Sequence, residues 1–132
     1  MRRASIGLAI AMIVAHFAVN VFHGLAHQRL AIEISPAEKV FVVVVILIAP
    51  LVAGVLLLLR VRRMGAWLLV VSMAGALVFG IYKHFIAAGS DHAFGLPYSK
   101  WALVFQTTAI LLVLTEAVGC WAGIRILSRE NS

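Results

Sequence analysis

Three of the chain's five histidines lie in one apolar stretch, HFAVNVFHGLAH, at residues 16–27. A helix turns by about 100° per residue, so four polar side chains of this stretch fall within about 60° of one another: His16, Asn20, His23 and His27. Such a stripe is costly against lipid, and we expect it to face the interior of a helix bundle. There it would form helix–helix hydrogen bonds or bind a ligand.

The outer part of this stripe has the spacing of a metal site. His23 and His27 are four residues apart, which lets two side chains of one helix hold a single ion. Neutral imidazole is a good ligand for zinc, copper and iron. We expect His84 at a similar depth to His23, because the two follow the starts of their apolar runs by similar numbers of residues. The sequence therefore predicts an outward-facing transition-metal site formed by His23, His27, His84, Asp91 and His92.

A second polar pair is expected deeper in the membrane. Glu116 lies inside the last apolar run, where an ionisable residue is a functional candidate that needs a partner. His16 is expected at the same depth, so we predict that the two side chains contact each other. They would form a clamp between two helices or the proton relay of a transporter. Supporting hydrogen bonds are expected from Asn20, Gln106 and Thr108.

The composition requires a lipid bilayer around these groups. Of the 132 residues, 64% are hydrophobic and only 12% are charged, whereas a soluble domain is about half apolar and about a quarter charged. Four apolar runs have roughly the 20 residues needed to cross a bilayer, at about 4–28, 36–59, 66–88 and 99–127. Short connections make neighbouring helices antiparallel. We predict an all-α integral membrane four-helix bundle, with residues 1–132 forming one four-pass domain.

Two local signals shape the second run. Ser35, Pro36 and Glu38 form the pattern of a capping box with proline at the first helical position, which predicts a helix start. Pro50 falls inside the same run and is expected to kink the helix, because proline lacks the backbone N–H of a helical hydrogen bond.

The basic residues indicate topology. A net charge of +6 in a soluble protein would suggest nucleic acid, but here the charges lie at the ends of the apolar runs, so no nucleic-acid partner is expected. The Lys/Arg excess lies on the side of both termini, which predicts cytoplasmic termini in a bacterial-type inner membrane or a plasma membrane. The start MRRASIGLAIAMIVA resembles a signal peptide, yet no A-x-A site follows it, and we expect it to stay as the first span. A single cysteine, Cys120, excludes an intrachain disulfide.

Three functions fit these features. The first is binding of a transition metal for sensing, delivery or catalysis by metal-bound water; the sequence shows no separate nucleophile and does not assign an enzyme activity. The second is a haem b electron carrier, with His84 and either His23 or His16 as axial ligands. The third is an accessory subunit of a homo-oligomer or larger membrane complex. Its contacts would be a GxxxG pair and a seam of small residues, namely Gly119 and Gly123, and Ser72, Ala76, Gly80 and His84.

Overall fold

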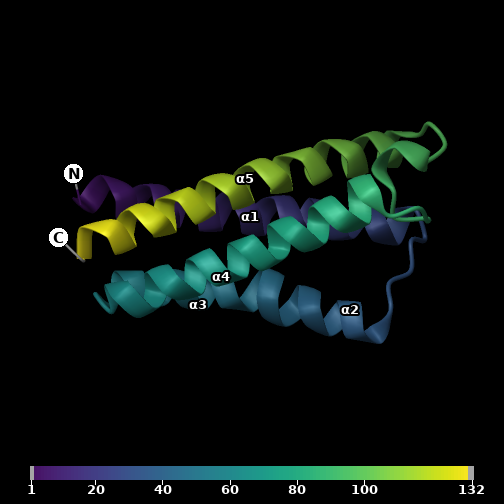
Figure 1. The fold of residues 1–132 in the computed structure, drawn as a ribbon. Helices are drawn as coiled ribbons and strands as arrows, with labels where there is room; N and C mark the ends of the chain where they lie inside the picture. Colours follow the sequence, from purple (N-terminus) through teal and green to yellow (C-terminus); the bar gives the residue numbers. More distant parts are fainter. Residues whose placement is uncertain (1, 131–132) are drawn as a thin grey trace.

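The computed structural model describes residues 2–130, and all their regular secondary structure is helical. Four helical segments are long and apolar enough to cross a membrane: Ala4–Arg29, Pro36–Leu58, Arg62–Ile86 and Lys100–Glu130. They lie side by side along one axis, with both termini at the same end (Figure 1). The predicted all-α four-helix bundle is confirmed. We call the end with the termini the terminal end and the opposite end the histidine end.

Several elements make up these segments. The first is α1 (Arg2–Arg29), and the second joins α2 (Pro36–Phe41), the π-helical η1 (Val42–Ile48) and α3 (Ala49–Leu58). The third joins α4 (Arg62–Ile81) and the π-helical η2 (Tyr82–Ile86). A short 3-10 turn, η3 (Ala93–Gly95), precedes α5 (Lys100–Glu130). The third segment begins at Arg62, before the predicted residue 66, because a helix can extend beyond its apolar run into charged residues that remain in contact with water.

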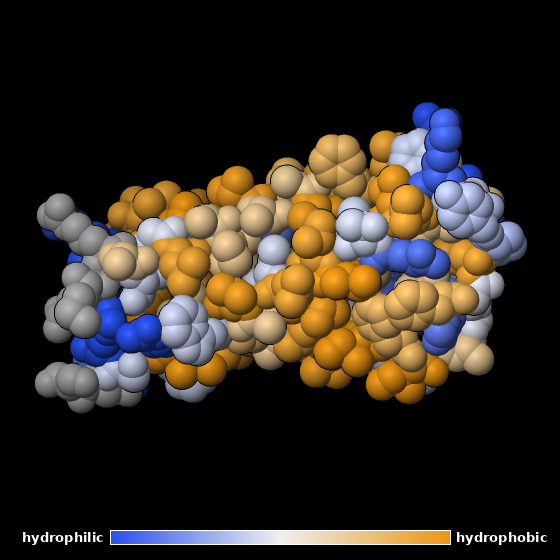
Figure 2. Space-filling model, turned by 90° about the horizontal axis from the view of Figure 1, so that it is seen from above, coloured by the Kyte–Doolittle hydropathy of each residue, from blue (hydrophilic) through white to orange (hydrophobic). Residues whose placement is uncertain are grey.

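The surface has the polarity that a membrane imposes. An apolar zone covers the middle of the molecule, and hydrophilic residues gather at its two ends (Figure 2). Large side chains in this zone are widely exposed, including Val14, Val71 and Val78 at 62%, 62% and 69%. Helices satisfy their own backbone hydrogen bonds, so such segments can lie in hydrocarbon. The composition, the helices and this surface together indicate an integral membrane protein.

Helix α5 is the central packing element, because its most extensive contacts are with α1 and α4. Gly119 and Gly123 lie where α5 crosses α4. A Cβ at Gly119 would lie 3.1 Å from Met73 Cγ, and one at Gly123 would lie 2.6 Å from Val70 Cγ2. The GxxxG pair therefore packs α5 against α4 within the chain.

The second segment is held closely at one end and diverges at the other. Close to the terminal end, a Cβ at Gly65 would lie 3.0 Å from the Ala53 carbonyl oxygen, so α3 and α4 are in near-backbone contact. Toward the histidine end, α2 turns away from α1 and α4 (Figure 1). Pro50 is the second residue after η1, and its missing N–H frees a carbonyl in the preceding turn, which suits a wider π-helical turn there.

The start of α2 confirms the predicted capping box. The Ser35 hydroxyl accepts a hydrogen bond from the Glu38 backbone N–H at 3.2 Å, and Glu38 Oε2 accepts one from the Ser35 N–H at 2.7 Å. Pro36 occupies the first turn, where its missing N–H costs nothing.

Candidate metal centre

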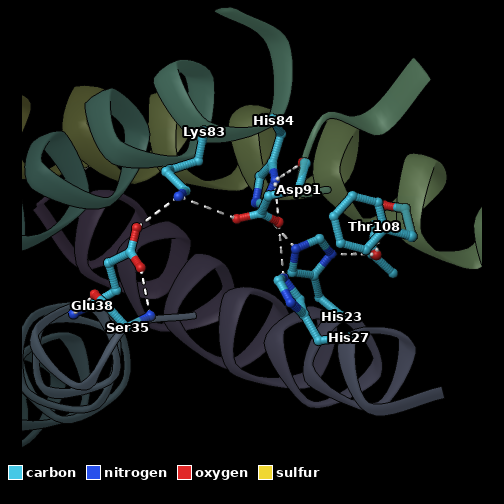
Figure 3. Close-up of polar contacts among 9 residues, drawn as sticks. His23, His27, Ser35, Glu38, Lys83, His84, Asp91 and Thr108 are labelled. Carbon is cyan, nitrogen blue, oxygen red and sulfur yellow. Dashed lines mark hydrogen bonds and ion pairs between the residues drawn. The ribbon is translucent and has the colours of Figure 1, made fainter. Parts of the chain in front are cut away.

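Three histidines from two segments converge at the histidine end (Figure 3). His23 and His27 are one turn apart on α1, and His84 lies in η2. One ligand atom from each residue can be chosen so that all three lie within 4.8 Å of one another. His23 and His84 are in direct contact, with 3.2 Å between their Nε2 atoms.

The π-helical turn of η2 helps to position His84. Its widened hydrogen bond runs from the Ala87 N–H to the Tyr82 carbonyl, five residues earlier. A turn with one extra residue changes the direction in which the following side chains leave the helix, and such turns are frequent at functional sites. His84 itself is buried, and only 6% of its surface is exposed.

The hydrogen-bond partners of His23 favour one tautomer. Its Nδ1 lies 2.8 Å from Thr108 Oγ1 on α5. Two backbone carbonyls also lie within reach of the Thr108 hydroxyl, Val104 O at 2.7 Å and Phe105 O at 3.1 Å. When the hydroxyl gives its single hydrogen to either carbonyl, its oxygen accepts from His23 Nδ1–H. In that arrangement the Nε2 of a neutral His23 carries a lone pair and no hydrogen.

The same reasoning applies to His84. Its Nδ1 lies 3.0 Å from the Asp91 backbone carbonyl, which can only accept, so the hydrogen of a neutral His84 is on Nδ1. Two nitrogen lone pairs, those of His23 Nε2 and His84 Nε2, then face each other at 3.2 Å. Two acceptors cannot bond to each other, and a cation between them resolves the conflict.

The 3.2 Å between His23 Nε2 and His84 Nε2 fits two ligands of one metal ion. Two nitrogen ligands at about 2.0–2.1 Å from a tetrahedral zinc ion lie about 3.3 Å apart. The three histidines span up to 4.8 Å, so small side-chain rotations would bring the third ligand to the same separation. His27 has a nitrogen to offer, because its buried Nδ1 has no hydrogen-bond partner among the described residues.

Asp91 lies beside the three histidines. Its Oδ1 is 3.4 Å from His27 Nε2 and 3.3 Å from His84 Nδ1, and it has no hydrogen-bond partner within residues 2–130. Burial alone would raise the pKa of Asp91, but contact with His84 and attraction to the neighbouring His27 and Lys83 lower it below its ordinary value. The carboxylate is therefore available to orient the imidazoles, a role that carboxylates often have around metal ligands.

An ion-pair chain joins this carboxylate to α2. Lys83 Nζ lies 2.6 Å from Glu38 Oε1 and 3.9 Å from Asp91 Oδ2 (Figure 3). Glu38 thus serves two purposes, since its other oxygen closes the capping box. The sequence signal for the cap was clear, but the link to Lys83 was not visible in it.

Phe105 on α5 forms the apolar side of the cluster and was missed in the sequence. Its fully buried ring stacks on His23 with 4.6 Å between ring centroids, and it meets the edges of His27 and His84. A phenylalanine among many apolar residues carries no signal of such a role.

Two predicted site residues have contacts in the loop before α5: His92, predicted as a ligand, and Gln106, predicted to support the deeper polar pair. His92 is outside the group of three histidines, and its backbone bonds to Gly89 and Gly95 within the turn. Gln106 Nε2 donates to the Ala93 carbonyl at 2.9 Å and so fastens η3 to α5. Of the predicted ligands, the structure brings together His23, His27 and His84, with Asp91 adjacent.

The deeper polar pair also meets. His16 Nε2 lies 3.1 Å from Glu116 Oε1, and both side chains are almost fully buried. Asn20 Nδ2 donates to the His16 carbonyl at 2.9 Å and lies 3.1 Å from His16 Nε2. Glu116 Oε2 is buried without a hydrogen-bond partner in the described part of the chain.

Comparison of the chain with protein-family models, curated proteins and solved structures gave no match.

Proposed function

We propose that this integral membrane protein binds a transition-metal ion through His23, His27 and His84. The observation that carries the proposal is the 3.2 Å between His23 Nε2 and His84 Nε2, on two rings whose Nδ1 atoms each lie within hydrogen-bond distance of an oxygen. Hydrogen bonding of the second ring nitrogen is a regular feature of histidine ligands in metal sites. A purely structural histidine pair would instead place a hydrogen between the two rings.

The donor set favours zinc. Three imidazoles and an adjacent carboxylate suit zinc, copper or iron, and the 3.2 Å separation corresponds to tetrahedral geometry. Three protein ligands leave a fourth position for water or another small ligand. All three histidines line one cavity, so that position would be reached from it. An exchangeable position suits sensing, delivery or catalysis by metal-bound water.

The same distance disfavours haem. Two axial histidines on opposite faces of a porphyrin have nitrogens about 4 Å apart, twice a metal–nitrogen bond, with the macrocycle between them. His23 and His84 contact each other directly. A haem between His23 and His84 would have to move apart the helical segments that bear them. Thr108 and Phe105 of α5 contact these histidine rings and oppose that separation.

The test is metal analysis of protein without a histidine tag, purified in mild detergent and measured by mass spectrometry. We expect about one zinc or copper ion per chain, retained after dialysis. The double variant His23→Ala, His84→Ala should lose the ion. His92→Ala is the matched control, since it removes a histidine of the same end that lies outside the cluster, and it should keep the ion.

Undiminished metal in the double variant, or equal loss in His92→Ala, would refute the assignment. A Soret band in the purified protein would favour the haem alternative. Native mass in nanodiscs addresses the accessory-subunit alternative, for which a stable complex with other chains is the expected result.

A further inference from the structure

A large cavity lies beside the metal centre and extends beyond it. Its volume is about 440 Å³, within the range of about 300–1,000 Å³ typical of ligand pockets. Residues of α1, η1, α4 and α5 line it, and most of the wall is apolar, including Val42, Ile46, Leu112 and Val113. The metal centre needs only a small part of this space, so the rest has no role in the proposed function.

The deep part of the cavity contains an unused hydrogen-bond acceptor. Glu116 lines it and is 2% exposed, and its Oε2 has no partner in residues 2–130. His16 Nε2 lies 3.1 Å from Oε1, and with one proton between these two atoms Oε2 is left as an acceptor. A buried acceptor left unpaired is unfavourable, and a donating ligand would satisfy it.

Glycine at position 80 keeps this acceptor accessible. Gly80 lines the same cavity, and a Cβ there would meet a single atom within 4 Å, Glu116 Oε2 at 4.0 Å. A larger side chain at this position would occupy the space in front of the carboxyl group.

The cavity reaches the exterior at the histidine end. Its lining includes the exposed residues Gly24, Gln28, Glu33 and Lys39, which lie on α1, on the following loop and on α2. This is where α2 diverges from α1 (Figure 1). A molecule with an apolar body could therefore enter from the bilayer or its surface.

We propose that the cavity binds a small amphipathic organic molecule, with a hydrogen-bond-donating amine or hydroxyl head at Glu116 Oε2 and an apolar body along η1 and α5. A carboxylate or phosphate head is disfavoured, because it would bring acceptors against an acceptor. The proposal does not require the metal, since Glu116 contacts His16, which precedes His23 by seven residues, or about two helical turns, on α1.

The test uses photoaffinity probes in nanodiscs: diazirine-bearing octylamine and octanol, with diazirine-bearing octanoic acid as the matched probe of the wrong head group. We expect the amine or the alcohol to label cavity residues such as Val42, Ile46 and Val113 at least tenfold more than the acid does. Excess unlabelled octylamine or octanol should compete. Stronger labelling by the amine than by the alcohol would indicate that the site recognises charge. Equal labelling by the amine and the alcohol would indicate that it recognises the hydrogen-bond donor alone.

Two variants locate the site. Gly80→Leu fills the space before the carboxyl group and should abolish cavity labelling, whereas Gly7→Leu adds the same side chain at an exposed position with nothing within 4 Å and should not. Glu116→Leu should abolish labelling, and Glu116→Gln, which keeps an acceptor oxygen, should retain labelling by the alcohol.

Equal cavity labelling by octanoic acid, absence of cavity labelling by all three probes, or unchanged labelling in both Gly80→Leu and Glu116→Leu would overturn the proposal. Helical content and elution profile show whether each variant is folded. Metal content measured on the same samples reports separately on the histidine site, so failure of one proposal is distinguishable from failure of the other.

Discussion

Replacing Thr108 by valine tests the hydrogen-bond reasoning behind the metal centre. The change keeps the shape of the side chain and removes the hydroxyl that accepts from His23 Nδ1 at 2.8 Å. A buried donor left without a partner costs about 1–3 kcal/mol. His23 can avoid this cost by moving its hydrogen to Nε2, where it would donate to His84 Nε2 at 3.2 Å. A metal ion that bound at the proposed site would have to displace that proton.

We therefore expect Thr108→Val to weaken metal affinity by about 10- to 100-fold, the range found when partners of metal-bound histidines are removed. This corresponds to about 1.4–2.7 kcal/mol. The assay is competition with a chromophoric chelator in detergent at fixed pH. Thr108→Ser keeps the hydroxyl and should stay within a few-fold of wild type. Equal affinity of the valine variant and wild type would refute the tautomer assignment, and complete loss of helical structure in the serine control would show that position 108 acts through packing.

Three further predictions concern packing, charge and topology. Gly123→Ala places a methyl group 2.6 Å from Val70 Cγ2, so overpacking should lower stability by about 1–3 kcal/mol in thermal unfolding, while Gly7→Ala, with open space around it, should not. The pKa of Asp91 is lowered from 3.8, so its carboxylate stabilises the fold above that pH and loses this effect as the pH falls through the lowered value. Asp91→Asn should thus lower the melting temperature at pH 7 and change it less near pH 3; an equal decrease at both would contradict the charge argument. A reporter that works only in the cytoplasm should be active when it is fused to either terminus. A result that placed the two termini on opposite sides of the membrane would exclude four membrane crossings.

The helices were predictable because lipid imposes a strong requirement on composition. A run of about 20 apolar residues has few alternatives to a membrane-spanning helix, and the capping box at Ser35 marked one start clearly. The similar depth of His23 and His84 followed from counting residues along two helices that run in the same direction. That count needs only a regular rise per residue.

The details of the centre were not predictable in the same way. The turn η2 is π-helical, and the hydrophobic pattern of Tyr82–Ile86 gives no sign of the extra residue that directs Lys83 and His84. The contacts of Thr108 and Phe105 depend on how α5 packs between α1 and α4. His92 adjoins Asp91 in sequence, but the loop backbone bonds keep it outside the cluster.

The second segment makes the bundle wider at one end than at the other. It is fastened to α4 at Gly65 near the terminal end and diverges at the histidine end. The Lys83–Glu38 ion pair holds the start of α2 beside η2. A movement of α2 that widened the mouth of the cavity would therefore have to break this ion pair, whereas the close contact at Gly65 would stay in place.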